Sequence, residues 1–189
     1  LREQERLMPL TDALRIIHNP MTPLELRLAQ LRLKFDELFY IQLNLARFVS
    51  ERQSRFKGYV FSRIGEKFNR FYRDKLPFEL TDAQKRVIRE IRNDMGSGNQ
   101  MNRLLQGDVG SGKTMVALMT MLIAIDNGYQ ACIMAPTEIL SEQHYANINR
   151  YLKGLGIKVE LLTGSIRGKR RERILKGLIE GSINILVST

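Results

Sequence analysis

Hydrophobic positions along this chain follow one period before residue 77 and a different one after it. In the first part apolar side chains recur every three or four residues, as they do on amphipathic helices. In the second part apolar runs of strand length alternate with segments of helix length. The apolar runs are Arg103–Leu105, Ala131–Ala135, Val159–Leu162 and Ile183–Val187. Strands that alternate with helices indicate a parallel sheet with helices on both faces, so the pattern predicts an α/β domain over 78–189, preceded by a helical region over 1–77.

The helical region contains one long predicted helix. Thr22 has the features of a helix cap, Pro23 suits the first helical position, and Glu25 completes a capping box. Apolar residues then form one continuous stripe, which predicts a helix as far as about Lys57, with Gly58 as its C-terminal stop. We expect this helix to pack against neighbouring structure and to carry no chemistry.

A second amphipathic segment follows, in which aromatic and basic residues are interleaved. Its apolar side chains are Phe61, Ile64, Phe68 and Phe71, and its basic ones are Arg63, Lys67, Arg70 and Arg73. Aromatic rings among cations can form a stacking surface for single-stranded nucleic acid. The same spacing also describes a core-facing helix side with basic residues outside, and this second interpretation is favoured.

The strongest chemical signal lies between the first two apolar runs of the second part. A stretch with the spacing of a phosphate-binding P-loop stands there: Gly107, Asp108, Val109, Gly110, Ser111, Gly112, Lys113 and Thr114. Glycines let the backbone N–H groups converge on phosphate oxygens, and the N-terminus of the following helix adds partial positive charge. Lys113 and Thr114 are the predicted catalytic residues, with Lys113 on the outer phosphates and the Thr114 hydroxyl on Mg²⁺. The chain is therefore predicted to bind a nucleoside triphosphate.

The net charge of +10 is concentrated in two stretches. Residues 52–75 contain eight basic and two acidic side chains, and residues 168–176 contain five and one. Each stretch alone could be a solvated face, but together with a nucleotide site they favour a polyanionic partner such as nucleic acid.

The remaining composition excludes several classes of protein. No apolar run reaches the roughly 18 residues of a membrane span and no signal peptide opens the chain, so a cytoplasmic protein with no membrane partner is expected. Cys132 lies in an apolar run and is expected to be a buried thiol. The chain begins with Leu1 and not with Met, which suggests that it was cut from a longer protein.

Residues upstream of the P-loop resemble the adenine-reading motif of superfamily-two helicases. They are Phe78, Leu80, Thr81 and Gln84, at the start of a predicted helix over 81–93. The resemblance implies that the aromatic ring packs on the adenine base and that the glutamine amide pairs with its edge, which selects ATP. Without the resemblance, Gln84 would be read as a surface residue behind a helix cap.

Two further motifs downstream of the P-loop extend the resemblance to the RecG family of branched-DNA helicases. Pro136, Thr137 and Glu138 form one motif, and Thr163, Gly164 and Ser165 form the other. In that superfamily both motifs bind the sugar-phosphate backbone, so the resemblance implies the same for these residues. It also implies a RecA-like lobe over 78–189, a linker between wedge domain and motor over 1–77, and branched double-stranded DNA as partner.

The resemblance leaves one element unmatched. Helicases of this group hold Mg²⁺ with an Asp-Glu pair, and no such pair follows Lys113. Asp126 is rejected as the acid because it lies within the helix that must follow the P-loop. The lobe is therefore expected to be incomplete, with little hydrolysis of ATP and with unpaired strand edges through which it could self-associate. A transcription-repair coupling translocase and a non-catalytic nucleotide-binding adaptor remain the alternatives.

Overall fold

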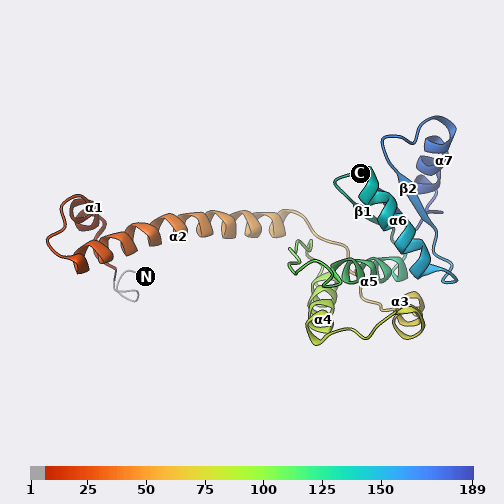
Figure 1. The fold of residues 1–189 in the computed structure, drawn as a ribbon, viewed down its shortest axis with the longest axis horizontal. Coiled ribbons are helices and arrows are strands. Elements are labelled where there is room, and N and C mark those ends of the chain that lie inside the picture. Colours follow the sequence, from red (N-terminus) through yellow and green to blue (C-terminus); the bar gives the residue numbers. More distant parts are fainter. Residues whose placement is uncertain (1–6) are drawn as a thin grey trace. The chain divides into compact units, whose positions relative to one another are not determined.

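The computed structural model describes residues 7–189 and divides the chain into two compact units (Figure 1). The first unit ends at Phe56, and the second spans Lys57–Thr189. Residues 57–77 belong to the same compact unit as 78–189, whereas their assignment to a linker region stays a prediction.

The first unit is a pair of helices, α1 (Leu10–His18) and α2 (Pro23–Arg55). The predicted capping box is present, because the Glu25 N–H donates to Thr22 Oγ1 at 3.2 Å and the Glu25 carboxylate accepts the Thr22 N–H at 3.2 Å. Ala13 and Ala29 are completely buried, and such small side chains let the two helices approach closely.

Gly58 does not terminate α2, which differs from the prediction. The helix ends at Arg55, and Phe56 is already extended. The Gly58 N–H donates to the carbonyl of Gly98 at 2.8 Å, and a Cβ added at Gly58 would stand 2.5 Å from the Asn99 carbonyl oxygen. Glycine is therefore required there for backbone pairing and not for helix termination.

The second unit combines a parallel sheet with helices, which confirms the predicted α/β class (Figure 1). Its elements are α3 (Glu66–Arg70), the π-helix η1 (Phe71–Lys75), α4 (Asp82–Gly96), α5 (Lys113–Asp126), β1 (Ala131–Met134), α6 (Glu138–Leu152), β2 (Val159–Leu162), α7 (Gly168–Ile179) and β3 (Ile185–Ser188). The described strands are ordered β1-β3-β2, and both pairs are parallel.

The sheet buries one face more completely than the other. Ile185 and Val187 of β3 are fully buried, and Val159 and Leu161 of β2 point to the same face. On the opposite face of β1, Met134 is 76% exposed and Cys132 is also exposed. The expectation of a buried thiol at Cys132 is wrong, because an apolar run does not by itself show that both faces of a strand are covered.

The apolar run Arg103–Leu105 is not a strand, in contrast to the other three runs. Leu104 is 84% exposed. The segment is held by ion pairs, because Arg103 contacts Glu90 at 2.9 Å and also pairs with Asp94, both on α4. Side-chain contacts to a helix thus take the place of the predicted backbone pairing.

Helix α5 forms the centre of the core. Leu118, Met119, Leu122 and Ile123 are at most 1% exposed, as expected of a helix that is apolar on all sides. Phe71 is fully buried and Phe68 belongs to the same core, so the predicted core-facing role of the aromatic and basic segment is correct. The predicted helix is present only from Glu66 onward, and Phe61 and Ile64 pack against the core from a segment without helical structure. Within residues 7–189 no helix is both long and apolar enough to cross a membrane.

Candidate nucleotide site and nucleic-acid interface

The predicted P-loop turns directly into the N-terminus of α5. Gly110 and Gly112 have φ angles of +82° and +81°, which L side chains rarely adopt. A Cβ added at Gly107 would stand 2.6 Å from Ser111 Oγ. The Ser111 N–H closes the turn by donating to the Asp108 carbonyl at 3.1 Å. The φ angles thus require glycine at positions 110 and 112, whereas a Cβ at Gly107 would have to displace the Ser111 hydroxyl.

Lys113 folds back over this loop. Its ammonium donates to the carbonyls of Gly107 at 2.7 Å and Asp108 at 2.8 Å. Both acceptors are neutral, so the positive charge stands at the loop beside the positive end of the α5 dipole. The two sources of positive potential favour an anionic group at this point.

Gln84 connects the upstream motif to the P-loop. Its amide Nε2 donates to the Ser111 carbonyl at 2.9 Å, and its Oε1 accepts the Thr81 N–H at 2.9 Å. Thr81 Oγ1 in turn accepts the Gln84 N–H at 3.2 Å, which completes the capping box of α4. Gln84 therefore acts as a helix-capping residue and contacts the phosphate loop as well. To pair with an adenine edge, the Gln84 side-chain amide would have to give up at least one of these two hydrogen bonds.

A cavity of about 350 Å³ adjoins the loop, within the size range of small-ligand pockets. Phe78 lines it together with Gly110, Gly112 and Thr114. The structure therefore brings the predicted base-packing ring to the predicted phosphate loop. Leu80 does not line this cavity, because it is buried in the core, and the Val109 side chain of the P-loop points into solvent and is fully exposed.

The segment leading to the loop is fixed to α4 by Arg103. Its hydrogen bond with Asp94 raises the pKa of the Arg103 guanidinium, and Glu90 adds to this effect. Arg103 joins the chain just before the P-loop to the helix that carries Gln84.

The two motifs predicted to bind DNA meet at the start of α6. The Ser165 N–H donates to the Glu138 carboxylate at 3.0 Å. Thr137 caps α6, because its Oγ1 accepts the Leu140 N–H at 3.3 Å. Thr163 is only 3% exposed, and its hydroxyl lies 2.8 Å from Ser165 Oγ. The other five predicted DNA-binding residues are exposed: Pro136, Thr137, Glu138, Gly164 and Ser165. Thr163 is buried beneath this surface.

Comparison with known proteins decides the family of the chain. The family model described as "DEAD/DEAH box helicase" matches residues 81–189, more than half of the sequence. The chain belongs to the DEAD/DEAH box helicase family.

Within this family the chain resembles RecG proteins along its whole length. It is 44% identical to the ATP-dependent DNA helicase RecG of Synechocystis and 43% identical to that of Bacillus subtilis, covering 100% of this chain in both. A solved structure of RecG bound to a three-way DNA junction superposes with a TM-score of 0.89 and 40% identity over 100% of this chain. The chain spans 23% and 28% of the two relatives and 26% of the solved chain.

Asp126 has a structural role in this chain, which supports its rejection as the catalytic acid. The side chain is 9% exposed at the end of α5. Its carboxylate accepts the N–H groups of Gly65 at 3.0 Å, Lys67 at 3.1 Å and Phe68 at 2.9 Å. The carboxylate thus caps α3 and does not face the P-loop.

Thr114 is the predicted metal ligand, and it lies at the cavity beside the P-loop glycines. Among the described residues no group of three His, Cys, Asp or Glu side chains could hold a metal ion. These residues therefore fit a nucleotide whose phosphates carry the metal with them, and they do not form a separate metal cage.

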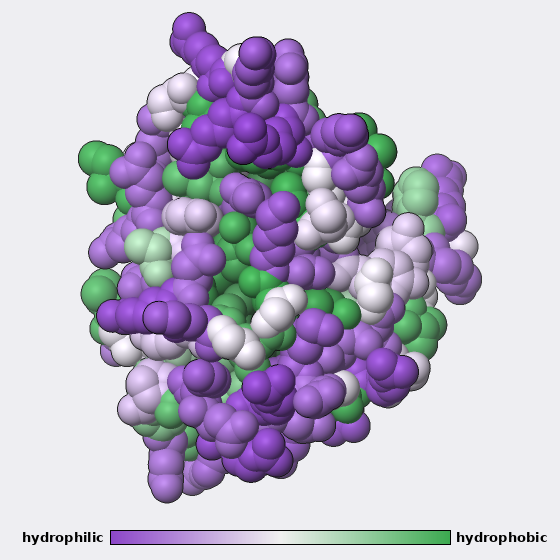
Figure 2. All heavy atoms as spheres, turned by 90° about the vertical axis from the view of Figure 1, so that its right-hand side faces the viewer, coloured by the Kyte–Doolittle hydropathy of each residue, from purple (hydrophilic) through white to green (hydrophobic). Residues whose placement is uncertain are grey.

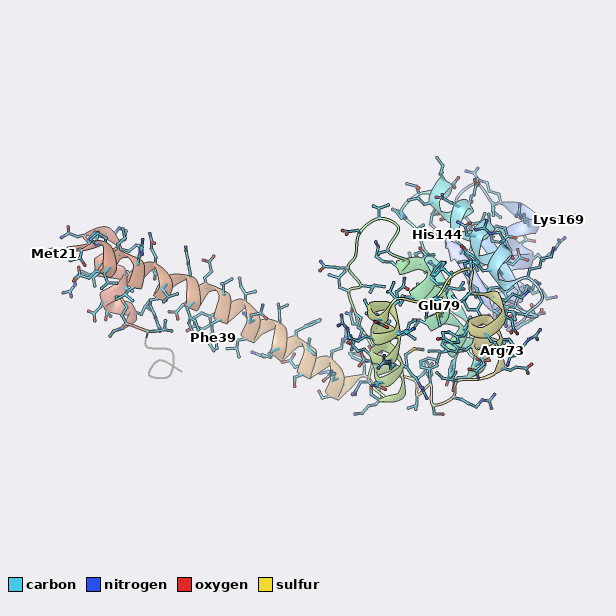
Figure 3. The ribbon with its side chains drawn as sticks, turned by 60° about the horizontal axis from the view of Figure 1, so that its bottom comes forward. Met21, Phe39, Arg73, Glu79, His144 and Lys169 are labelled. Carbon is cyan, nitrogen blue, oxygen red and sulfur yellow. The ribbon has the colours of Figure 1, made fainter. Side chains whose placement is uncertain are left out.

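Helix α6 contributes cavity residues that sequence reasoning did not assign to the nucleotide site. Gln143, His144 and Asn147 line the same cavity as Phe78. Figure 3 shows His144 on this helix. The sequence did contain a signal for these cavity residues. Positions 143, 144 and 147 are polar, although the same helix buries Ile148.

Proposed function

We propose that this chain is part of an ATP-dependent DNA helicase of the RecG type that acts on branched DNA. Residues 78–189 would be the first, RecA-like lobe of its motor, and residues 1–77 would link that lobe to a wedge domain. The shared cavity of Phe78 and the P-loop carries the proposal, because it joins the motif for adenine to the motif for phosphate. The RecG relatives make the coupling translocase and the adaptor the less favoured alternatives.

In the proposed site the ATP phosphates would lie on the P-loop N–H groups, with Lys113 transferred from the loop carbonyls to the outer phosphates. The Thr114 hydroxyl would help to hold Mg²⁺, which would supply positive charge against the phosphates. Phe78 would pack on the base, and Gln84 would read its edge. Lys113 is well placed for this transfer, because its carbonyl partners belong to the same loop as the phosphate-binding N–H groups.

The proposed DNA interface is the exposed junction of Glu138 and Ser165. Hydroxyl and N–H groups there would contact the sugar-phosphate backbone, which suits a translocase because backbone contacts do not depend on sequence. By itself this chain is proposed to bind ATP and to hydrolyse very little of it. An Asp-Glu pair, which would orient the attacking water, is not found after Lys113.

Nucleotide titration tests the proposal. ATP, ADP and GTP are titrated with Mg²⁺ into the chain, into Lys113→Ala and into Lys153→Ala, whose exposed lysine lies outside the site. We expect adenine-selective binding that is lost only in Lys113→Ala. Equal binding by both variants, or equal affinity for ATP and GTP, would contradict the assignment of the site.

A further inference from the structure

Helix α7 presents an unusually dense group of cations. Arg167 and α7 carry six basic side chains and a single acid between residues 167 and 176; the cations are Arg167, Lys169, Arg170, Arg171, Arg173 and Lys176. All six are exposed. Only Lys176 forms a recorded ion pair in the described part of the chain, with Glu180 at 3.7 Å. The patch, which we call the α7 patch, therefore keeps most of its charge available to a partner.

Fold stability does not account for these cations. Lys169, Arg170 and Arg171 occupy the first turn of α7, which contains no acid and has no side-chain cap. Positive charge at this end opposes the helix dipole and weakens the helix by a few tenths of a kcal/mol or more per residue. Residues that disfavour the helix they belong to are better explained by contact with an anion.

The scaffold under the α7 patch is firmly packed. Ile174 is 3% exposed, and a Cβ added at Gly177 would stand 2.9 Å from Ile183 Cδ1, so the helix lies close against the chain that leads to β3. Figure 3 shows Lys169 projecting from the edge of the unit. Figure 2 shows hydrophilic side chains protruding at the upper end of the face that includes α7. A helix that is held firmly in place and whose basic side chains face solvent can bind a rigid polyanion.

The α7 patch continues directly from the proposed DNA interface. Arg167 is two residues beyond Ser165, and between them Ile166 is 7% exposed and anchors the chain. The Ile166 N–H donates to the Thr163 carbonyl at 3.1 Å, so a tight turn joins the two surfaces. A nucleic-acid strand held at Ser165 would therefore pass close to the first turn of α7.

We propose that the α7 patch is a second contact with the sugar-phosphate backbone of duplex DNA, beside the Glu138–Ser165 junction. This inference rests on the proposed function and extends it, because it assigns part of the contact with duplex DNA to residues outside both predicted DNA motifs. The contact is electrostatic and independent of sequence, since Lys and Arg side chains alone supply it. An acidic protein surface is the competing partner, and the experiment below separates the two.

The test compares two variants of equal charge change in the full-length protein that carries this chain. The first is the triple variant Lys169→Gln, Arg170→Gln, Arg171→Gln. The control is Arg86→Gln, Arg89→Gln, Arg92→Gln, which removes three exposed cations from α4 of the same unit. Affinity for a plain duplex and for a three-way junction is measured by fluorescence anisotropy over a range of salt concentrations, and the melting temperature and ATP affinity are measured alongside.

The α7 variant is expected to bind both DNAs more weakly and to lose about 3 from the slope of log affinity against log salt, since each phosphate contact contributes about 0.9. Its melting temperature should be unchanged or higher, because the removed cations oppose the helix dipole, and its ATP affinity should be unchanged. The control should keep the wild-type salt slope.

Equal losses in both variants, or none in the α7 variant, would overturn the proposal while leaving the helicase assignment intact. The second of these results would favour the acidic protein partner. Failure of the wild-type protein to bind DNA at all would instead refute the proposed function together with this inference.

Discussion

The carboxylate of Asp126 offers the most direct test of the structure. It connects the end of α5 to the start of α3 by accepting three backbone N–H groups, from Gly65, Lys67 and Phe68. The substitution Asp126→Ala removes all three acceptor contacts without touching the P-loop. We therefore expect a loss of stability with the nucleotide site preserved.

The size of the expected stability loss follows from how deeply each of the three N–H donors is buried. Phe68 is 8% exposed, so its N–H would stay without an acceptor at a loss of about 1–3 kcal/mol. The N–H groups of Gly65 and Lys67 are only partly buried and would regain water, which limits each loss to about 0.5–1 kcal/mol. The total loss of stability for Asp126→Ala is about 2–5 kcal/mol. Asp126→Asn keeps one carbonyl oxygen and should lose about half as much.

Urea denaturation of the chain, followed by circular dichroism, measures the free energy of unfolding of both variants. Glu142→Ala is the matched control, because this acid is exposed on α6 and its removal should change stability by at most about 0.5 kcal/mol. Wild-type stability of Asp126→Ala would refute the capping role. A stable Asp126→Asn that no longer binds ATP would show instead that the acid belongs to the nucleotide site.

Three further predictions follow from local geometry. Gly112→Ala should weaken ATP binding at least about tenfold, because its φ of +81° strains an alanine and the new methyl would collide with the Gln84 amide; nucleotide titration checks this. Gly177→Ala should destabilise the chain by up to about 2 kcal/mol in urea, because overpacking against the buried Ile183 exceeds the gain in helix propensity, whereas Gly96→Ala, in an α-helix with free space around it, should be neutral or stabilising. Although Cys132 is exposed, partial desolvation by its neighbours raises the pKa of its thiol, so its alkylation should be slower at about pH 8 than that of an unfolded control and should accelerate as the pH rises further.

Local patterns in the sequence predicted the elements that depend on local interactions. The capping residues Thr22 and Thr81 begin α2 and α4 as expected, and the apolar segment behind Lys113 forms α5. The strand predicted over Arg103–Leu105 is absent. Strand pairing depends on residues that are distant in the sequence, and here the ion pairs of Arg103 with α4 hold the segment instead.

The site was predicted less completely, for a related reason. The P-loop conformation follows from its glycines, which encode their own φ angles. The cavity is different, because Gln143, His144 and Asn147 lie along the middle of α6, beyond the predicted motif at its start. Gln84 is a third case, because the same side chain both caps α4 and donates a hydrogen bond to the P-loop.

Helix α6 gives the proposed helicase a physical route between nucleotide and DNA. Its middle lines the cavity beside the P-loop, and its first residue, Glu138, holds the Ser165 N–H. Near its start, Ser141 Oγ donates to the Ser188 carbonyl at 3.0 Å, which ties the helix to the end of β3. The same helix therefore contacts the proposed nucleotide cavity along its middle and the proposed DNA contact at its first residue, so the two sites share one structural element.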